Sequence, residues 1–187
     1  MSDVTGRVDV SAVWPDVFST ERLCATPVSE VDGALFAALY GDAETMAHIG
    51  APLDVDAAAR GLSGALRQMR SDPPKARYWR LDEDGHAAGL LSLVVDPDRH
   101  TAETGVLLGD GARGRGIARE ALAALLPRVV CAGGLDAVWT RHRPGHAAAD
   151  GLMRALGFAP LGTADGWARW QMDRRRLQAL AETPVTV

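Results

Sequence analysis

A glycine- and arginine-rich run in the middle of the chain, Arg113-Gly114-Arg115-Gly116-Ile117-Ala118, constrains the fold more than any other feature. It follows an alternating segment at 101–108 that predicts a strand, and it opens a helix predicted from about residue 114 to 130. A helix start leaves backbone N–H groups unpaired and carries the positive end of the helix dipole. Glycines let such a backbone approach a ligand closely, and arginines pair with phosphate oxygens. The run therefore predicts a loop that binds a phosphate or pyrophosphate.

Two common nucleotide-binding motifs do not account for this loop. The chain has no Gly-x-x-x-x-Gly-Lys-Ser/Thr sequence, which excludes a P-loop hydrolase by motif. Gly109, Gly111 and Gly114 have the spacing of a dinucleotide fingerprint, and Asp136 follows at a suitable distance, but they lie mid-chain after a predicted hairpin. Without an early strand–helix–strand unit, this spacing alone favours only a turn and a helix cap.

The segments around the loop form one domain-sized pattern. Helices are predicted from Ser29 to about Gly41, from Asp54 to about Met69, and over 147–156, besides the helix after the loop. Strands are predicted over 20–27, 76–81, 89–95, 101–108, 137–140, 157–161 and 166–172. The 187 residues fit one domain at 20–174, with an N-terminal arm or strap at 1–19 and a C-terminal tail at 175–187.

Composition and charge narrow the class of partner. The formal net charge is −4, whereas bulk electrostatic binding of nucleic acid needs clustered Lys and Arg, so no nucleic acid partner is expected. No apolar run reaches membrane-spanning length and the N-terminus does not resemble a signal peptide, so we expect a cytoplasmic protein with no membrane partner. Cys24 and Cys131 lack CxxC spacing and are expected to be buried thiols. Only Lys75 among the 20 basic residues is a lysine, a bias that suggests a GC-rich bacterial genome.

The loop and its neighbours resemble a known family. Arg113-x-x-Gly116-x-Ala118 matches the Arg/Gln-x-x-Gly-x-Gly/Ala pyrophosphate loop of the GNAT N-acetyltransferase superfamily, in the element order that this family requires. Over roughly residues 20–173 the chain resembles especially the branch of ribosomal-protein alanine acetyltransferases. Thr20-Glu21-Arg22-Leu23 is similar to the opening strand of that branch, and Leu156-Gly157-Phe158 is similar to the sequence after its fourth helix. The resemblance implies an α+β (mixed α/β) fold with a central mixed, mostly antiparallel splayed sheet, flanked by about four helices.

The resemblance also implies a co-substrate, acetyl-CoA or another acyl-CoA, and no metal. Its pantetheine arm would lie between two parting strands, with backbone groups at the end of the fourth strand as hydrogen-bond partners. Its pyrophosphate would lie in the glycine-rich loop. The residues expected to bind it are Val106, Leu107, Leu108, Arg113, Gly114, Arg115, Gly116, Ile117, Ala118 and Arg119.

Transfer to an amine needs groups that handle protons, because the attacking amine must be neutral and the departing thiolate takes up a proton. Glu103 resembles the glutamate that accepts the ammonium proton through water in this branch; an exposed strand carboxylate is the alternative. Counting back from Leu156-Gly157-Phe158, His146 takes the family's Asn position and Ala149 takes that of its usual hydroxyl donor. His146 is therefore a candidate acid, base or pantetheine contact, with a helix-capping or surface histidine as the alternative.

The leading hypothesis is an acyl-CoA-dependent N-acyltransferase that moves an acetyl or short acyl group to a primary amine of a small molecule, peptide or protein N-terminus. Ala149 in place of the hydroxyl donor keeps two alternatives open. One is a non-catalytic acyl-CoA sensor or partner-binding module, and the other is an enzyme that uses an unusual acyl donor. Dimers are common among proteins of this kind, so a homodimer is an expected assembly.

Overall fold

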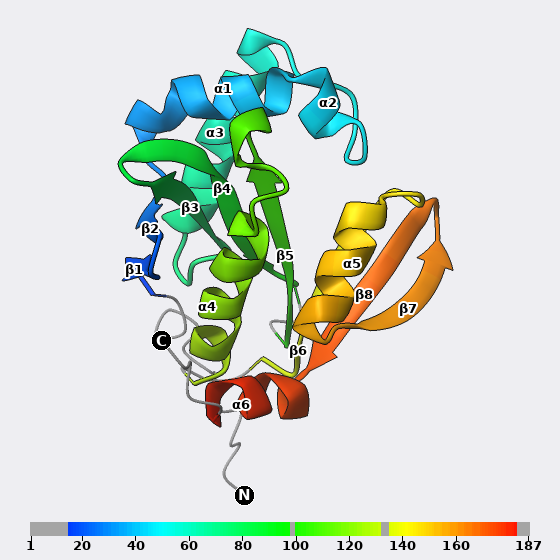
Figure 1. Cartoon of the computed structure of the whole chain (residues 1–187). Coiled ribbons are helices and arrows are strands. Elements are labelled where there is room, and N and C mark those ends of the chain that lie inside the picture. The colour runs from blue at the N-terminus through cyan, green and yellow to red at the C-terminus, as the bar shows by residue number, and fades with distance from the viewer. Residues whose placement is uncertain (1–14, 98–99, 132–134, 183–187) are drawn as a thin grey trace, which may run out of the picture.

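One eight-stranded sheet organises the protein (Figure 1). The computed structural model describes residues 15–97, 100–131 and 135–182. The strands are β1 (Phe18–Ser19), β2 (Leu23–Pro27), β3 (Ala76–Glu83), β4 (His86–Val95), β5 (Thr101–Leu108), β6 (Ala137–His142), β7 (Ala159–Ala164) and β8 (Trp167–Asp173). Their order in the sheet is β1-β2-β3-β4-β5-β6-β8-β7, and every neighbouring pair is antiparallel except β5 and β6. The mixed, mostly antiparallel sheet expected from the sequence is confirmed.

Six α-helices flank this sheet in the described parts of the chain. They are α1 (Gly33–Gly41), α2 (Ala43–Met46), α3 (Val55–Met69), α4 (Ile117–Cys131), α5 (Ala147–Leu156) and α6 (Arg174–Glu182). Two of them, α2 and α6, add to the four expected. Helix α2 is a single turn, capped by the Asp42 carboxylate that accepts from the Thr45 N–H at 2.6 Å, and so short a helix leaves no periodicity in the sequence. Within the described segments no helix is long and apolar enough to cross a membrane.

Residues 1–14 and 183–187, parts of the predicted N-terminal arm and C-terminal tail, lie outside the described residues. Where the predicted arm is described, β1 pairs with β2 and Phe18 is buried against the core. Where the predicted tail is described, α6 places Leu177 in the core with no exposed surface. The division of the chain at residues 20 and 174 stays a prediction.

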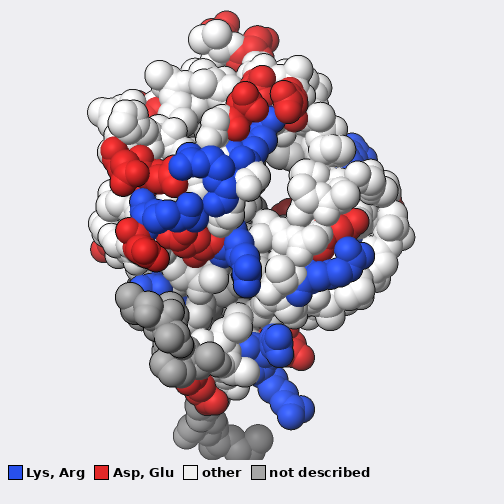
Figure 2. Space-filling view, in the orientation of Figure 1, with Lys and Arg blue, Asp and Glu red and all other residues white. Residues whose placement is uncertain are grey.

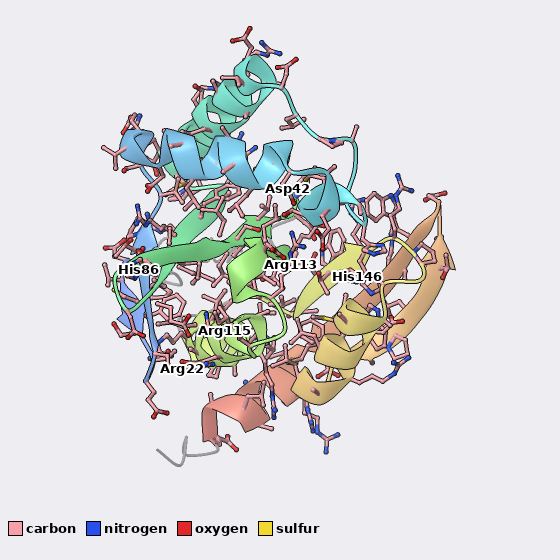
Figure 3. All side chains as sticks on the ribbon, turned by 45° about the horizontal axis from the view of Figure 1, so that its top comes forward. Arg22, Asp42, His86, Arg113, Arg115 and His146 are labelled. Atoms are coloured by element: carbon pink, nitrogen blue, oxygen red, sulfur yellow. The ribbon has the colours of Figure 1, made fainter. Side chains whose placement is uncertain are left out.

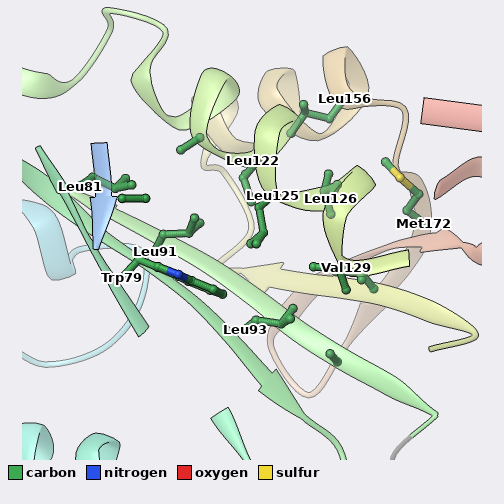
Figure 4. Packing of buried hydrophobic residues seen from close by; sticks show 14 of the residues in the cluster. Trp79, Leu81, Leu91, Leu93, Leu122, Leu125, Leu126, Val129, Leu156 and Met172 are labelled. Carbon is green, nitrogen blue, oxygen red and sulfur yellow. The ribbon is translucent and has the colours of Figure 1, made fainter. Parts of the chain in front are cut away.

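Helix α4 forms the centre of the larger hydrophobic core. Its buried side chains recur at helical spacing: Ile117, Ala121, Leu122, Leu125, Leu126 and Val129. They pack against Trp79, Leu81, Leu91 and Leu93 from β3 and β4 (Figure 4). Burying one leucine of this kind contributes about 1.5–3 kcal/mol, so the stripe fixes α4 firmly on one face of the sheet. The loop before α4 is held in place as a consequence.

Helices α1 and α3 cover the opposite face of the sheet at β3 and β4. A second core lies between them, with Phe36 and Leu39 from α1, Leu62 and Leu66 from α3, and Leu90 from β4. Helix α3 begins where the sequence predicts, because the Asp54 carboxylate accepts the Ala57 N–H at 2.7 Å and caps its first turn. The N-terminal half of the sheet thus carries helices on both faces.

The sequence Leu156-Gly157-Phe158 ends α5 for a structural reason. Gly157 has φ +86, a left-handed conformation that L side chains adopt at a cost. The Phe158 N–H donates to the Met153 carbonyl at 2.9 Å, and Leu156 and Phe158 are both buried. The motif therefore stops the helix and anchors its end in the core.

The expectation of a buried Cys24 is wrong, because this residue is exposed. Leu23 and Ala25 on either side of it are buried, so strand alternation turns the intervening side chain away from the core. Cys131 is the last residue of α4, and its side chain lies outside the described part of the structure.

Candidate active site

The middle of the sheet opens between β5 and β6. The two strands pair only where Thr101–Glu103 meets Ala137–Trp139, and residues 104–108 do not pair with residues 140–142. Each strand keeps its partner on the other side, β4 for β5 and β8 for β6. The facing edges of β5 and β6 therefore present unpaired backbone groups, which can bind an extended ligand as a further strand. This is the splayed sheet that the sequence led us to expect.

A cavity of about 720 Å³ occupies this opening. In Figure 2 the surface is hollowed there, and Lys and Arg side chains gather along one rim. Among the predicted site residues, the cavity is lined by Glu103, Val106, Leu107, Leu108, Arg113, Gly114, Gly116, Ile117, Ala118, Arg119 and His146. Thr104 and Val106 lie on the sheet face that packs on α4, whereas Glu103 and Leu107 lie on the face of α1 and α3. The cavity thus connects the two faces of the sheet.

The glycine-rich loop ends at the first turn of α4. Gly114 and Gly116 have φ +71 and +81, so both adopt the left-handed region that glycine tolerates best. No other side chain lies within 4 Å of where a Cβ of Gly114 would stand. The first hydrogen bond of the helix joins the Glu120 N–H to the Gly116 carbonyl at 3.0 Å, which leaves the N–H groups just before it without a helical partner. The loop is suited to an anion that approaches the backbone.

Arg113 points toward α2 rather than standing free (Figure 3). Its guanidinium lies 2.7 Å from the Glu44 carboxylate and 3.2 Å from that of Asp42, and it donates to the Thr45 hydroxyl. Its Nε donates to the Leu108 carbonyl at 3.3 Å. This arginine therefore ties the end of β5 to the helix that borders the cavity.

Arg115 is the one predicted cofactor residue that does not line the cavity. Its guanidinium lies 2.7 Å from the Glu83 carboxylate on β3. Its carbonyl accepts from Arg22 at 3.3 Å (Figure 3). Arg22 in turn forms a 2.6 Å ion pair with Glu120, which also accepts from Thr20. Thr20 and Arg22 of the Thr-Glu-Arg-Leu sequence thus stabilise the loop through Glu120 and the Arg115 carbonyl. This role was not predicted from the sequence.

Glu103 lies at the point where β5 leaves β6, half-buried, with its carboxylate 3.2 Å from Arg141 Nε. Burial raises the pKa of Glu103 above its usual value, and the neighbouring Arg141 only partly offsets this effect. The carboxyl group therefore keeps its proton up to a higher pH than an exposed glutamate does. A raised pKa makes its carboxylate a stronger proton acceptor than that of an exposed glutamate.

Three histidines meet at the other side of the opening. The ring of His146 stacks on that of His48 at 4.2 Å and meets the edge of the His142 ring at 5.7 Å. Burial, followed by the neighbouring His48 and His142, lowers the pKa of His146 below its usual value. The Arg143 N–H also donates to the His48 carbonyl at 3.1 Å, which joins the two halves of the molecule across the cavity. Ala149 lines the same wall and offers no hydroxyl.

His48 and Arg141 were not predicted as site residues. His48 comes from the segment after α2, and Arg141 is one of many arginines in the chain, so neither lies in a motif that could have revealed it. Both reach the cavity only because the fold brings their segments together.

Comparison with known proteins supports the same fold. The ribosomal L7/L12 alpha-N-protein acetyltransferase RimL in complex with coenzyme A superposes with a TM-score of 0.73 at 17% identity, covering 84% of this chain and 97% of that one. The spermidine N-acetyltransferase from Vibrio cholerae in complex with CoA and spermine gives 0.71 at 16% identity, with 84% and 99% covered. The microcin C7 self-immunity acetyltransferase MccE in complex with acetyl-CoA and AMP gives 0.72 at 13% identity, with 87% and 99% covered.

A search among curated protein sequences gives no significant match. A family model, however, matches residues 22–159, which is well over half of the chain and includes the loop, Glu103 and His146. By that match, the chain belongs to the family of the acetyltransferase (GNAT) domain.

Proposed function

We propose that this protein is an acyl-CoA-dependent N-acyltransferase that moves an acetyl or short acyl group from CoA to a primary amine. The observation that carries the proposal is the cavity through the sheet, because it joins the glycine-rich loop to a carboxylate and a histidine. The pyrophosphate would meet the N–H groups at the start of α4, and the pantetheine arm would lie along the free edge of β5. The thioester would then stand between Glu103 and His146. Structural neighbours in complex with CoA or acetyl-CoA support this donor.

In this mechanism Glu103 receives a proton from the ammonium form of the acceptor, directly or through water. The neutral amine attacks the thioester carbonyl, a C–N bond forms, and the C–S bond breaks. His146, largely neutral at physiological pH because its pKa is lowered, takes the proton released by the attacking nitrogen and returns it to the thiolate. One imidazole thus replaces the hydroxyl donor that Ala149 lacks.

The cofactor site is tested by Gly116→Glu, which adds a negative charge to the loop and a side chain at a backbone position with φ +81 that L residues rarely adopt. We expect acetyl-CoA affinity, measured by titration calorimetry, to fall at least about tenfold, since removing one charge-assisted contact already costs about 1.5–3 kcal/mol. The matched control is Gly151→Glu, which adds the same charge on the exposed side of α5. Circular dichroism checks that both variants fold. Unchanged affinity in a folded Gly116→Glu variant would overturn the assignment of the loop.

A non-catalytic acyl-CoA sensor is the second candidate, favoured by Ala149 in the cavity wall. The two functions differ in thiol release from acetyl-CoA in the presence of a panel of primary amines. Release above the rate without amine supports the transferase. Tight acetyl-CoA binding with no release for any amine supports the sensor.

A further inference from the structure

The proposed acceptor end of the cavity carries two arginines close to Glu103. Arg141 lies on the sheet face that bears Glu103, two residues after Trp139, the register partner of Glu103, and it lines the cavity. Arg169 is the register partner of Arg141 on β8. It too lowers the pKa of Glu103, so its charge reaches the same carboxylate. Two guanidinium groups and a second carboxylate, that of Asp96, therefore act on Glu103.

Arg141 is held in a fixed position by aromatic rings. Its guanidinium carbon lies 4.9 Å from the ring centre of Trp167 and 5.7 Å from that of Trp139. Trp139 is itself anchored, because its indole N–H donates to the Asp96 carboxylate at 2.7 Å. Stacking of this kind orders an arginine and leaves its outer N–H groups available.

The outer N–H groups of Arg141 have no protein partner among the described residues. Only its Nε is engaged, by Glu103 at 3.2 Å, and the side chain is 38% exposed. Neither of two other nearby carboxylates pairs with Arg141. Asp96 accepts from Trp139, and Asp165 lies 3.9 Å from Arg169 with its side chain 88% exposed. An arginine fork that is ordered, accessible and unsatisfied suits a carboxylate or phosphate.

We infer that the acceptor is a small amine that carries an anionic group, a carboxylate or a phosphate, bound by Arg141 while its amino group lies at Glu103. The inference rests on the proposed function, since it describes the acceptor of that reaction. Because Glu103 and Arg141 are in contact, the amine and the anion must lie close together in the acceptor, as in a free amino acid. Arg141 is then the residue that determines acceptor specificity.

The charges argue against a polyamine as the acceptor. Asp42, Glu44 and Asp110 form an acidic group beside the loop, and all three face Arg113, at 3.2, 2.7 and 3.8 Å. Their charge is therefore partly neutralised before any ligand arrives. A polycation would instead meet the guanidinium of Arg141, which repels it.

The test compares acceptors that differ only in the anionic group. Thiol release from acetyl-CoA is measured with alanine against alaninamide and with phosphoethanolamine against ethanolamine, and spermidine is included as the polycation. In the wild-type protein we expect kcat/KM to be higher for at least one anionic acceptor than for its partner without the anionic group. The pair with the larger difference shows whether the anion is a carboxylate or a phosphate. Equal rates within both pairs, or a preference for spermidine, would overturn the inference.

The variant Arg141→Gln should reduce kcat/KM for the anionic acceptor by about tenfold to a hundredfold, the range for loss of a charge-assisted hydrogen bond. For the partner without the anionic group, kcat/KM should change only through the effect of the substitution on Glu103. The ratio of the two kcat/KM values within a pair therefore isolates the contact with the anion. Arg141→Lys keeps the positive charge but not the forked guanidinium. Its kcat/KM for the anionic acceptor should lie between the values of the wild type and Arg141→Gln. The control is Arg60→Gln on the exposed side of α3, expected to match the wild type. A ratio unchanged in Arg141→Gln would refute the assignment.

Binding without turnover separates this inference from the proposed function. Trp139 and Trp167 contact Arg141, so an anion there should alter tryptophan fluorescence in the absence of acyl-CoA. If alanine or phosphoethanolamine binds the wild type but not Arg141→Gln while no amine is acetylated, the anion site stands and the transferase fails. If amines are acetylated but neither pair shows a preference, the transferase stands and the anion site fails.

Discussion

Gly89 offers the sharpest test of how closely β4 and β5 approach beside the cavity. It is buried on β4 opposite Leu108, and a Cβ added there would stand 2.1 Å from the Leu107 carbonyl oxygen and 2.8 Å from Leu108 Cδ2. Because ordinary carbon contacts lie at about 3.5 Å, Gly89→Ala must move the Leu107 carbonyl away by roughly 1.4 Å. The clash is with backbone, which cannot rotate away as a side chain would.

The size of the effect follows from two opposing terms. Overpacking of this kind costs about 1–3 kcal/mol, and the backbone contact places Gly89→Ala near the upper end. Replacing glycine by alanine returns about 0.4–1 kcal/mol, because the unfolded chain loses conformational freedom. The net loss in unfolding free energy is therefore about 2 kcal/mol, which lowers the Tm by about 4–8 °C for a chain of this size.

The same variant should weaken acetyl-CoA binding, since the displaced residues carry the free edge proposed to hold pantetheine. Each backbone hydrogen bond lost costs about two- to twelvefold in affinity. Urea denaturation and calorimetry measure the two effects, and Gly151→Ala is the matched control, with no atom within 4 Å of the added Cβ. That control lies inside α5 and should gain about 0.5–1 kcal/mol. Wild-type stability and affinity in Gly89→Ala would refute the strand spacing described here.

Three further predictions concern the core and two carboxylates. Leu125→Ala, at a fully buried position on α4, should lose about 2–5 kcal/mol in urea denaturation, and a loss below about 1 kcal/mol would contradict the packing. Burial disfavours the charge of Glu120, but hydrogen bonds from Thr20 and Arg22 outweigh it and hold its pKa below the usual value. Its stabilisation is thus present above a pH of about 4.3 and lost as pH falls through the lowered pKa, so Glu120→Gln should flatten the acid limb of stability against pH. Glu103 has a raised pKa, so acetyl transfer should increase as pH rises through it; Glu103→Gln should remove this limb from a kcat/KM profile, and an unaltered profile would exclude Glu103 as the base.

The cofactor end of the candidate site could be proposed from the sequence because its determinants are local. A strand, a run of glycines and a helix start follow one another within about 20 residues, and the same few residues set both conformation and chemistry. The positive φ values of Gly114 and Gly116 are consistent with that interpretation. The end of α5 at Leu156-Gly157-Phe158 could also be predicted, since the left-handed glycine and its two buried neighbours are adjacent in the chain.

The direction in which a side chain points was harder to predict than the element on which it lies. Arg115 sits between two glycines of the loop, yet its guanidinium turns to Glu83, because a buried carboxylate on β3 needs a partner. Cys24 was expected inside, but alternation along β2 turns it out. Both outcomes depend on which neighbouring strand lies alongside, and that information is not local.

The proposed acceptor end could not be predicted from the sequence because four distant segments build it. His48 follows α2, Glu103 lies on β5, Arg141 on β6 and Trp167 on β8, and they meet only through the register of β5 with β6 and of β6 with β8. Under the proposed function the two ends would bind their ligands in different ways. Backbone groups and glycines would hold the cofactor, whereas side-chain charge would select the acceptor. Arg141 and its two tryptophans are then the residues expected to distinguish the acceptor of this protein from that of a neighbour with the same fold.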